Sequence, residues 1–263
     1  RIENLGVDDA RITGNGQGVP PPSGYPVYFA GGIVAEAANH TTLKNVYATN
    51  GVEIKGQDGG LGGIVGHLSN SKINTAYSKV KIGEGGGIAG WTAGSEIDDS
   101  YSDASHFSGS NGTDFVYLID PDDTKIKNSY ATGSRFTWST SATQISNTYQ
   151  YDKDTGKTKL IGSSTLLDGH SKATYAGWSI NNNGDPGAKW RIYEGRTAPL
   201  LTAFMSGTAT ATYRYRYFNA DGSADTDTGN TVKSNNGADL SNLTYNSKYL
   251  KIVDRNAPTA AGD

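Results

Sequence analysis

The chain has 263 residues, and its 23 basic and 26 acidic side chains leave a formal net charge of -3. These charges are interspersed, without a basic stripe, which argues against nucleic acid as a partner. Cysteine is absent, so disulfides, cysteine nucleophiles and thiolate metal sites are excluded. Hydrophobic residues amount to 35% of the chain, so little apolar material is available, which suits a thin, elongated core. The 16 tyrosines argue against intrinsic disorder.

The beginning of the chain is predicted to be irregular. Residues 16–26 read GQGVPPPSGYP, whose three consecutive prolines indicate an extended segment, and we assign residues 1–26 to an N-terminal connector. The chain starts at Arg1 without Met or a signal-like apolar segment, so we interpret it as a piece of a longer protein. No apolar run approaches the ~18 residues of a membrane span, and none is expected.

Pairs of glycine followed by isoleucine recur in the first half of the chain. The three copies are GGIV (31–34), LGGIVG (61–66) and GGIAG (86–90). We expect each pair to form a corner at positive φ, where a Cβ atom would be strained, with Ile33, Ile64 and Ile88 pointing into the interior. Flexible loops are the alternative, but loops do not require an isoleucine after every glycine pair.

A second motif follows, with Ile or Leu at position i, most often Asn at i+2, a small or β-branched residue at i+3 and Tyr at i+4. Its five copies are LKNVYA (43–48), INTAYS (73–78), IDDSYS (97–102), IKNSYA (126–131) and ISNTYQ (145–150). Successive tyrosines are 30, 24, 29 and 19 residues apart. Short β-like segments at such a period are typical of stacked solenoid repeats whose equivalent strands pair in parallel. We therefore predict an all-β, right-handed parallel β-helix over residues 27–205.

The orientation of the tyrosines depends on the residue at i+2. Strict alternation puts the residues at i, i+2 and i+4 on one face, and the large area that stacked rings bury favours the core for that face. A bend at Asn, which tolerates the left-handed conformation, would instead turn the residues at i+3 and i+5 inward and the tyrosines outward. We favour core tyrosines, although the alternation of Ala76, Ser78, Val80 and Ile82 supports the bend.

The paired motifs resemble the GLUG repeat of large bacterial surface proteins and exoproteins. The similar stretches are AGGIVAEAANHTTLKNVYA (30–48), LGGIVGHLSNSKINTAYSKVKI (61–82) and GGIAGWTAGSEIDDSYS (86–102), and the resemblance covers residues 30–150. It implies a filamentous-haemagglutinin-like adhesin exported by two-partner secretion, and it implies no catalytic residues. The GGI block is missing before the last two tyrosine motifs, where irregular coils are expected.

Two further segments follow the repeats. GDPGAKWRIYEGRTAPLL (184–201) resembles the closing element of GLUG arrays, in which Trp190, Ile192 and Tyr193 would cap the open end of the core. Residues 206–263 are assigned to a C-terminal β extension or the start of a following domain. Its predicted strands, TATATYRYRYF (208–218) and KYLKIVD (248–254), would form a β-hairpin.

The sequence offers no motif of cofactor or metal chemistry, and we expect neither. GNGQG (14–18) and GQDGG (56–60) lack the Lys-Ser/Thr and the helix of a phosphate-binding loop, and neither G-x-S-x-G nor H-E-x-x-H occurs. DKDTG (152–156) and DTDTG (225–229) are predicted turns rather than calcium loops, because each lacks the bidentate Glu of an EF-hand. The widely spaced histidines are predicted to lie on the surface: His40, His67, His106 and His170.

Clustered carboxylates keep a sugar-cleaving site under consideration, because a glycosidase needs two carboxyl groups ~5 to 10 Å apart. The clusters are Asp98, Asp99 and Asp103, and Asp120, Asp122 and Asp123. We favour the simpler interpretation that these residues initiate turns and keep a sheet edge soluble.

The predicted function is that of a non-catalytic segment of a bacterial adhesin, secreted or at the cell surface, that binds a host glycan or protein or acts as a rigid spacer. The predicted glycan-binding residues are Trp91, Tyr101 and Asp103, and Trp138 is a further candidate for sugar stacking, with core or cap packing as the alternative. Asn39, Asn111 and Asn242 are possible glycosylation sites. The alternatives are a carbohydrate-active enzyme on the same scaffold and a biofilm-matrix protein that self-associates through outward tyrosines.

Overall fold

The computed structural model describes residues 1–14, 28–49, 51–56, 60–120, 124–138, 144–182 and 187–205, together with three strands at 210–218, 231–235 and 249–255. The chain divides into two compact units, Arg1–Trp178 with Ile192–Leu201, and Ser179–Arg191 with Thr202–Asp263. The described residues are all-β, as predicted: they contain the short 3-10 helices η2 (Lys172–Tyr175) and η3 (Thr202–Phe204) but no α-helix. No helix within these ranges has the length and apolar character that a membrane crossing requires.

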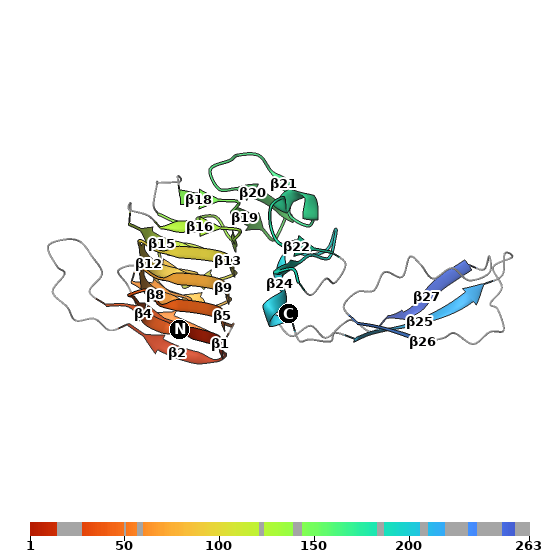
Figure 1. Ribbon diagram of the computed structural model, residues 1–263, viewed down its shortest axis with the longest axis horizontal. Helices are drawn as coiled ribbons and strands as arrows, with labels where there is room; N and C mark the ends of the chain where they lie inside the picture. Colours follow the sequence, from red (N-terminus) through yellow and green to blue (C-terminus); the bar gives the residue numbers. More distant parts are fainter. Residues whose placement is uncertain are drawn as a thin grey trace. The chain divides into compact units, whose positions relative to one another are not determined.

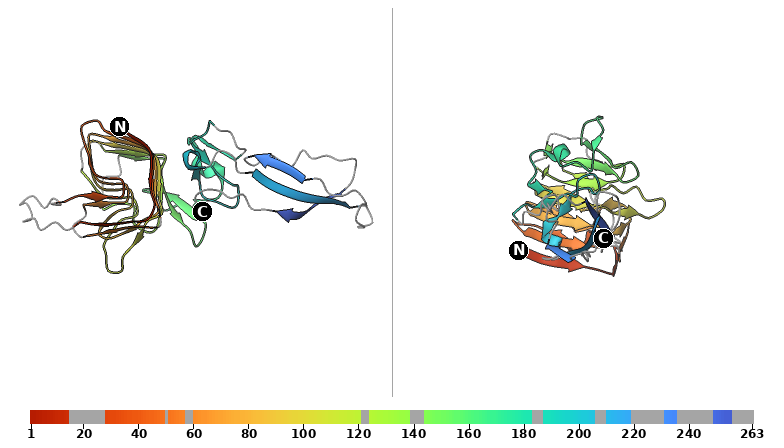
Figure 2. Two further views of the ribbon diagram at one scale, coloured as in Figure 1. Left: turned by 90° about the horizontal axis from the view of Figure 1, so that it is seen from below. Right: turned by 90° about the vertical axis from the view of Figure 1, so that its right-hand side faces the viewer.

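Four sheets of parallel strands make up most of the first unit (Figures 1 and 2), and their ladder order follows the order of the repeats. Sheet A contains β1 (Ile2–Val7), β5 (Thr42–Ala48), β9 (Lys72–Ser78), β13 (Glu96–Ser102), β16 (Lys125–Lys127), β17 (Tyr130–Thr132), β18 (Ile145–Ser146) and β19 (Tyr149–Asp152). Sheet B contains β2 (Ala10–Thr13), β6 (Val52–Lys55), β10 (Lys81–Ile82) and β14 (Ser105–His106). Sheet C contains β3 (Ala30–Gly31), β7 (Leu61–Gly62) and β11 (Gly85–Gly86), and sheet D contains β4 (Val34–Ala37), β8 (Val65–Ser69), β12 (Ala89–Ala93) and β15 (Val116–Ile119). This arrangement is consistent with a β-helix-like fold.

The parallel pairing begins earlier in the chain than expected. Strand β1 pairs with β5 in the register Ile2 to Leu43, and β2 pairs with β6. Residues 2–13 therefore belong to the sheets rather than to a connector over residues 1–26. The sequence IENLGV of β1 is a sixth copy of the second motif, with Gly6 in place of tyrosine. The proline-rich stretch falls in 15–27, outside the described residues.

The residue at i+2 of each tyrosine motif has a left-handed backbone. The φ angles are 56° at Asn4, 51° at Asn45, 68° at Thr75, 47° at Asp99, 50° at Asn128 and 45° at Asn147. This bend reverses the alternation of side chains, so positions i, i+3 and i+5 all point into the core. In β5 these positions are Leu43, Val46 and Ala48, and all three are fully buried. The expectation of core tyrosines is therefore wrong, because Asn, Asp and Thr adopt the bend that reverses the faces.

The tyrosines instead form a stack of their own on the opposite face of sheet A. The rings of Tyr47, Tyr77, Tyr101 and Tyr130 have centroids 5.1 to 5.2 Å apart and planes within 4 to 7° of each other. The hydroxyl of Tyr130 donates a hydrogen bond of 2.9 Å to the carbonyl of Pro199. Although they lie outside the core, the rings from Tyr77 to Tyr130 are buried.

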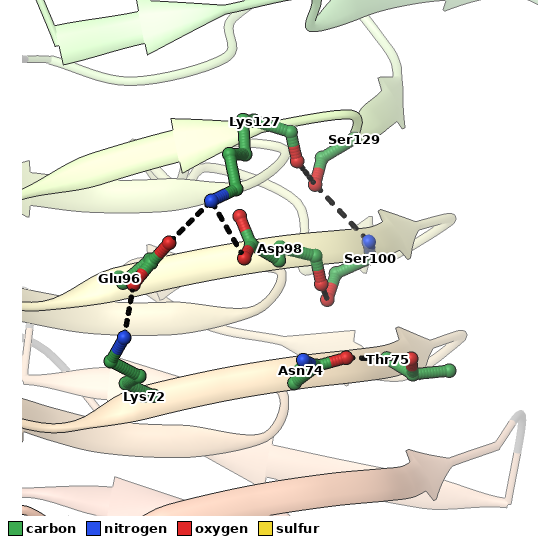
Figure 3. A network of polar contacts seen from close by, with 8 residues as sticks. All are labelled: Lys72, Asn74, Thr75, Glu96, Asp98, Ser100, Lys127 and Ser129. Atoms are coloured by element: carbon green, nitrogen blue, oxygen red, sulfur yellow. Dashed lines mark hydrogen bonds and ion pairs between the residues drawn. The ribbon is translucent and has the colours of Figure 1, made fainter. Parts of the chain in front are cut away.

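The bend interrupts the backbone ladder, and hydroxyl groups at i+3 repair it. The N–H of Ala76 donates to Ser100 Oγ over 3.1 Å. The N–H of Ser100 donates to Ser129 Oγ, also over 3.1 Å (Figure 3). Each serine hydroxyl donates in turn to the carbonyl two residues earlier in its own strand, over 2.8 Å. Because unpaired buried N–H groups are costly, small hydroxyl residues suit these core positions.

The glycine corners are present, but the predicted reason for them is wrong. Neither Gly62 nor Gly63 has a positive φ. Their missing Cβ atoms instead allow close approach of the backbone: a Cβ on Gly62 would clash with the carbonyl of Val65, and one on Gly63 with the carbonyl of Gly87. The isoleucines that follow, Ile64 and Ile88, are fully buried as predicted, whereas Ile33 in the first full repeat is only partly buried.

The parallel order of sheet A ends in antiparallel strands. Strand β19 pairs antiparallel with β20 (Lys157–Leu160), which pairs antiparallel with β21 (Leu167–Asp168). DKDTG is the hairpin turn between β19 and β20, as predicted, and Asp152 Oδ1 accepts the N–H of Asp154 at 2.9 Å. Strand β24 (Leu200–Leu201) also belongs to the first unit.

The second unit contains two small groups of strands. Strand β22 (Ile180–Asn181) pairs in parallel with β23 (Trp190–Arg191). Strand β25 (Thr210–Phe218) lies between β26 (Thr231–Asn235) and β27 (Tyr249–Arg255), antiparallel to both. Strands β25 and β27 fall where two strands are predicted, and β26 was not predicted. Trp190 belongs to this unit while Ile192 and Tyr193 belong to the first, so the predicted cap residues do not share one compact unit.

Thr75→Asn is expected to stabilise the protein. A β-branched residue at a φ of 68° is strained, whereas Asn occupies the same column in four other repeats. We expect a gain of about 1 kcal/mol in the free energy of unfolding, measured by chemical denaturation. Thr42→Asn, in an ordinary strand conformation, is the control and should give no gain; equal effects of the two changes would contradict the interpretation.

Gly62→Ala is expected to destabilise the protein by about 2 kcal/mol or more, because backbone must move to admit the Cβ atom. Gly162→Ala is the control, since Gly162 has a φ of 86° but no atom within 4 Å of its Cβ position. There only the conformational cost of about 1 kcal/mol applies. A smaller loss at Gly62 than at Gly162, in the same denaturation experiment, would show that close packing does not determine the corner.

Candidate ligand-binding groove

The corner glycines give way to polar residues in the last two repeats. Gly86 bridges to Thr113, and the N–H of Gly87 donates to the carbonyl of Thr113 at 3.1 Å. Asp114 therefore takes the place of the second glycine, and its own N–H donates to the carbonyl of Arg135 at 2.7 Å. The corner of these repeats carries two charged side chains where the earlier repeats carry glycine.

The core continues through this region because phenylalanine replaces isoleucine. The N–H of Ile88 donates to the carbonyl of Phe115 at 2.7 Å, and Phe115 stacks on Phe136 with centroids 4.6 Å apart. Both rings are buried. The missing GGI blocks are thus present as TDF and SRF, and aligning Phe with Ile would have revealed the replaced glycines in the sequence.

A groove of about 660 Å³ is lined by these corners and by the β19–β20 hairpin. Most of the residues that line it have polar side chains, and Leu166 adds an exposed apolar one. The charged residues that line it are Asp103, Asp114, Asp152, Asp154, Lys153, Lys157 and Lys159. Ser105, Ser134 and Gln150 add neutral hydrogen-bonding groups.

Three of the four carboxylates in the groove already have partners. Asp103 accepts from Thr132 Oγ1 at 2.6 Å and pairs with the ammonium of Lys153. Asp114 accepts the N–H of Arg135 at 2.5 Å, and its other oxygen lies 3.6 Å from Nε2 of His106. Asp152 accepts backbone N–H groups within the hairpin turn. These contacts give the three carboxylates structural roles, and of the three only Asp103 is paired with a lysine.

The basic side chains around the groove have fewer ionic partners than the carboxylates have contacts. Across the described residues, Lys159 and Arg135 take part in no ion pair. Lys159 lies opposite Gln150 in the antiparallel ladder. Lys157 takes part in no ion pair of the described residues either, although it lies opposite Asp152 and Asp168 on the neighbouring strands.

An exposed indole follows in the chain four residues after Ser134, which lines the groove. Tyr117 lies in β15 of sheet D, and the N–H of Trp138, which belongs to no described strand, donates to the carbonyl of Tyr117 at 3.2 Å. Trp138 is 42% exposed, its Nε1 donates to the carbonyl of Asn111 at 3.0 Å, and the guanidinium of Arg135 lies 3.6 Å from its ring centroid. The ring is therefore both accessible and fixed in orientation.

The predicted glycan-binding residues do not converge on one place. Trp91 lies in sheet D, packs near Phe29 and His67, and is only 9% exposed, so little of its face is available for stacking. Tyr101 belongs to the tyrosine stack of sheet A. Asp103 follows β13 and lines the groove. Their role in glycan binding stays a prediction, and of the three only Asp103 is at the groove.

The remaining candidates are scattered. Asn39 and Asn111 are exposed, and Asn242 lies outside the described residues.

The histidines lie in different surroundings. His40 is exposed, whereas His67 approaches Glu36 at 3.2 Å, and Nε2 of His170 lies 2.8 Å from the hydroxyl of Tyr151. Both ring nitrogens of His106 are buried without a hydrogen bond, which was not predicted. Among the residues with defined positions, no group of three or more His, Asp or Glu side chains is arranged to hold a metal ion.

The carboxylate clusters have different structural roles. Asp99 is 2% exposed and forms the left-handed bend of β13, in line with a turn residue. Asp98 faces outward in a charged network (Figure 3), in which Glu96 contacts Lys72 and Lys127 at 2.5 Å and Lys127 lies 3.1 Å from Asp98. Asp120 follows β15, and Asp122 and Asp123 lie outside the described residues.

This network separates the pKa values of its two acids. Burial raises the pKa of Asp98 to about 6, against the opposing effect of Lys127. Hydrogen bonds from Lys127 and Lys72 lower the pKa of Glu96 to about 2. Lys127 contacts both carboxylates, and as the pH falls Asp98 takes up a proton before the more exposed Glu96 does.

Comparison with known proteins gives no relative: no family model, curated protein or solved structure matches this chain.

Asp98→Asn is expected to stabilise the protein at pH 8 and to have less effect near pH 4.5. The raised pKa means that the folded state binds a proton more tightly, so the stability that Asp98 contributes is present below about pH 4 and lost as the pH rises through 6. Asn has no such dependence. Thermal unfolding of both proteins at the two pH values tests this, and a pH-independent difference would contradict it.

Glu96→Gln is the matched variant with the opposite sign. The lowered pKa of Glu96 means that its contribution is present above about pH 4.5 and is lost as the pH falls towards 2. The variant should therefore lose stability at pH 7 and approach the parent protein at pH 3.

Proposed function

We propose that this chain is a right-handed parallel β-helix from a GLUG-type bacterial surface adhesin, secreted or held at the cell surface. It is non-catalytic, and it presents a binding surface for a host glycan or protein while serving as a rigid spacer. This proposal rests on the corner positions of the repeats. Polar residues replace the two glycines, and phenylalanine replaces isoleucine, only in the last two repeats. The repeats before them keep a uniform glycine corner, as a spacer requires.

Rigidity is supported by the register of the sheets. Strands β5, β9 and β13 pair without a slip over their shared positions, and equivalent core side chains stack from repeat to repeat. Solenoids of this kind gain stability from nearest-neighbour contacts and offer extended surfaces for partners. Such a scaffold positions a site through reach and shape rather than through motion.

The state of the carboxylates supports a non-catalytic role. A glycosidase requires one carboxyl group free to donate a proton and a second free to attack or to activate water. Asp103 and Asp114 are both occupied by hydrogen bonds and ionic contacts, and Asp99 is buried in a backbone bend. Of the four carboxylates described around the groove, Asp154 alone has no hydrogen bond or ionic contact to its side chain, which leaves the enzyme alternative without a pair of free carboxylates there.

Lateral self-association through tyrosines also receives little support. Tyr77, Tyr101 and Tyr130 are 7%, 8% and 4% exposed, so their rings offer little area to another molecule. Their burial serves the stability of this chain first.

The proposal is tested by binding and turnover on the intact chain. On a printed glycan array and on immobilised host matrix proteins, we expect at least one ligand to be retained and to be recovered unchanged in mass. Shortened or unsaturated sugars after incubation would overturn the non-catalytic assignment. Concentration-dependent dimers that Tyr77→Ser abolishes, with no ligand retained, would replace adhesion with self-association.

A further inference from the structure

The pair formed by Trp138 and Arg135 has the properties of a prepared binding site. Contacts with Asn111, Tyr117 and Arg135 fix the indole before any ligand arrives, so binding costs little side-chain entropy. Because Arg135 covers one face of the ring, the exposed 42% of Trp138 is mainly its other face and edge. A flat apolar face of this kind accepts the C–H face of a sugar ring.

The platform is continuous with the polar groove through the backbone. Ser134 lines the groove, and the next residue, Arg135, lies on Trp138. A ligand with several rings that stacks on the indole would extend along this segment of backbone towards the groove. There, Ser105, Ser134 and the side-chain oxygen of Gln150 are available for hydroxyl groups, since the Gln150 amide nitrogen is already fixed at 2.7 Å from the carbonyl of Gly133.

The balance of unpaired charge indicates the kind of sugar. Arg135 has its guanidinium beside the indole and no carboxylate partner among the described residues, and Lys159 likewise has none. Of the carboxylates in the groove, Asp103, Asp114 and Asp152 are held by hydrogen bonds and Asp103 also pairs with Lys153, while Asp154 lies at the exposed tip of the hairpin. Stacking on an aromatic ring leaves the N–H edge of a guanidinium able to bind a carboxylate through two hydrogen bonds.

We propose that this platform and groove bind an acidic, carboxylate-bearing oligosaccharide. Trp138 stacks on one sugar ring, Arg135 pairs with the carboxylate of that ring or the next, and Lys159 pairs with a further carboxylate in the groove. This inference rests on the proposed adhesive function, and it names both the site and the ligand class. Neutral glycans, which share the ring but lack the charge, bind more weakly at the same site.

The experiment uses a printed panel of uronate- and sialate-bearing oligosaccharides, each beside its methyl-esterified, uncharged counterpart. The intact chain is expected to bind at least one acidic member about tenfold more tightly than its ester, and the difference should shrink at high salt. Trp138→Ala should weaken binding roughly tenfold, Trp138→Phe less, and Arg135→Gln should remove most of the preference for the acid over the ester.

Arg196→Gln and Lys172→Gln are the matched controls, because both residues are exposed and neither lines the groove. Both should bind like the parent chain, and thermal unfolding establishes that each variant is folded. Equal binding of acids and esters, binding of neutral glycans or proteins alone, or binding unaffected by Trp138→Ala in a folded variant would overturn this inference while leaving the adhesive function in place. Turnover of any sugar would overturn the adhesive function itself.

Discussion

A parallel, in-register sheet places each residue beside its counterpart in the next strand, and this constraint governs the first unit. The left-handed residue at i+2 of each tyrosine motif is the clearest effect of this constraint. A strand that lacked the bend would turn its core residues outward while its neighbours kept theirs inward, and the ladder on one side would be lost. Thr75 accepts a strained φ of 68° under this constraint, between Asn45 and Asp99, which adopt the same conformation more easily.

The bend also explains how a chain with few apolar residues builds a stable structure. It lets one strand of sheet A supply two packed layers, an inner one of small and aliphatic side chains and an outer one of stacked tyrosines. Each ring pair adds about 0.5 to 1.5 kcal/mol beyond the area it buries. Burial raises the pKa of Tyr77 to about 12 and that of Tyr101 further, so the phenols stay neutral. The stack begins where the ring of Tyr47 lies over Gly6, which has no side chain to displace it.

Much of this architecture could be predicted from the sequence, because the copies of a motif show which residue types recur at equivalent positions of each repeat. The all-β character, the parallel strands and the burial of Ile64 and Ile88 follow from the copies alone. The face occupied by the tyrosines could not be decided, since it depends on the φ of one residue and both alternatives bury the ring. The reason for the corner glycines was misjudged because the approach of the next backbone, not local conformation, excludes a Cβ atom at Gly62.

The candidate site was harder to predict, because it lies where the motif is no longer recognisable. Trp91 belongs to a regular repeat, in which an aromatic side chain meets its neighbours and becomes buried. Trp138 belongs to an irregular one and stays half exposed. Sequence reasoning that follows the copies therefore places Trp91 ahead of Trp138, although Trp138 is the more exposed of the two, because regularity predicts packing and says nothing about accessibility.

Replacement of a corner glycine has a structural cost that must be compensated locally. The carboxylate of Asp114 occupies the space where a Cβ of Gly133 would lie, and Gly133, at a φ of 125°, takes a conformation that other residues disfavour. The chain thus keeps a glycine one repeat later in order to accommodate the aspartate, which then holds the backbone of Arg135. Local rules are broken most often where function requires it. The compensating residues orient the Arg135 backbone beside the groove, so the irregular repeats are an organised part of the fold rather than a decay of the pattern.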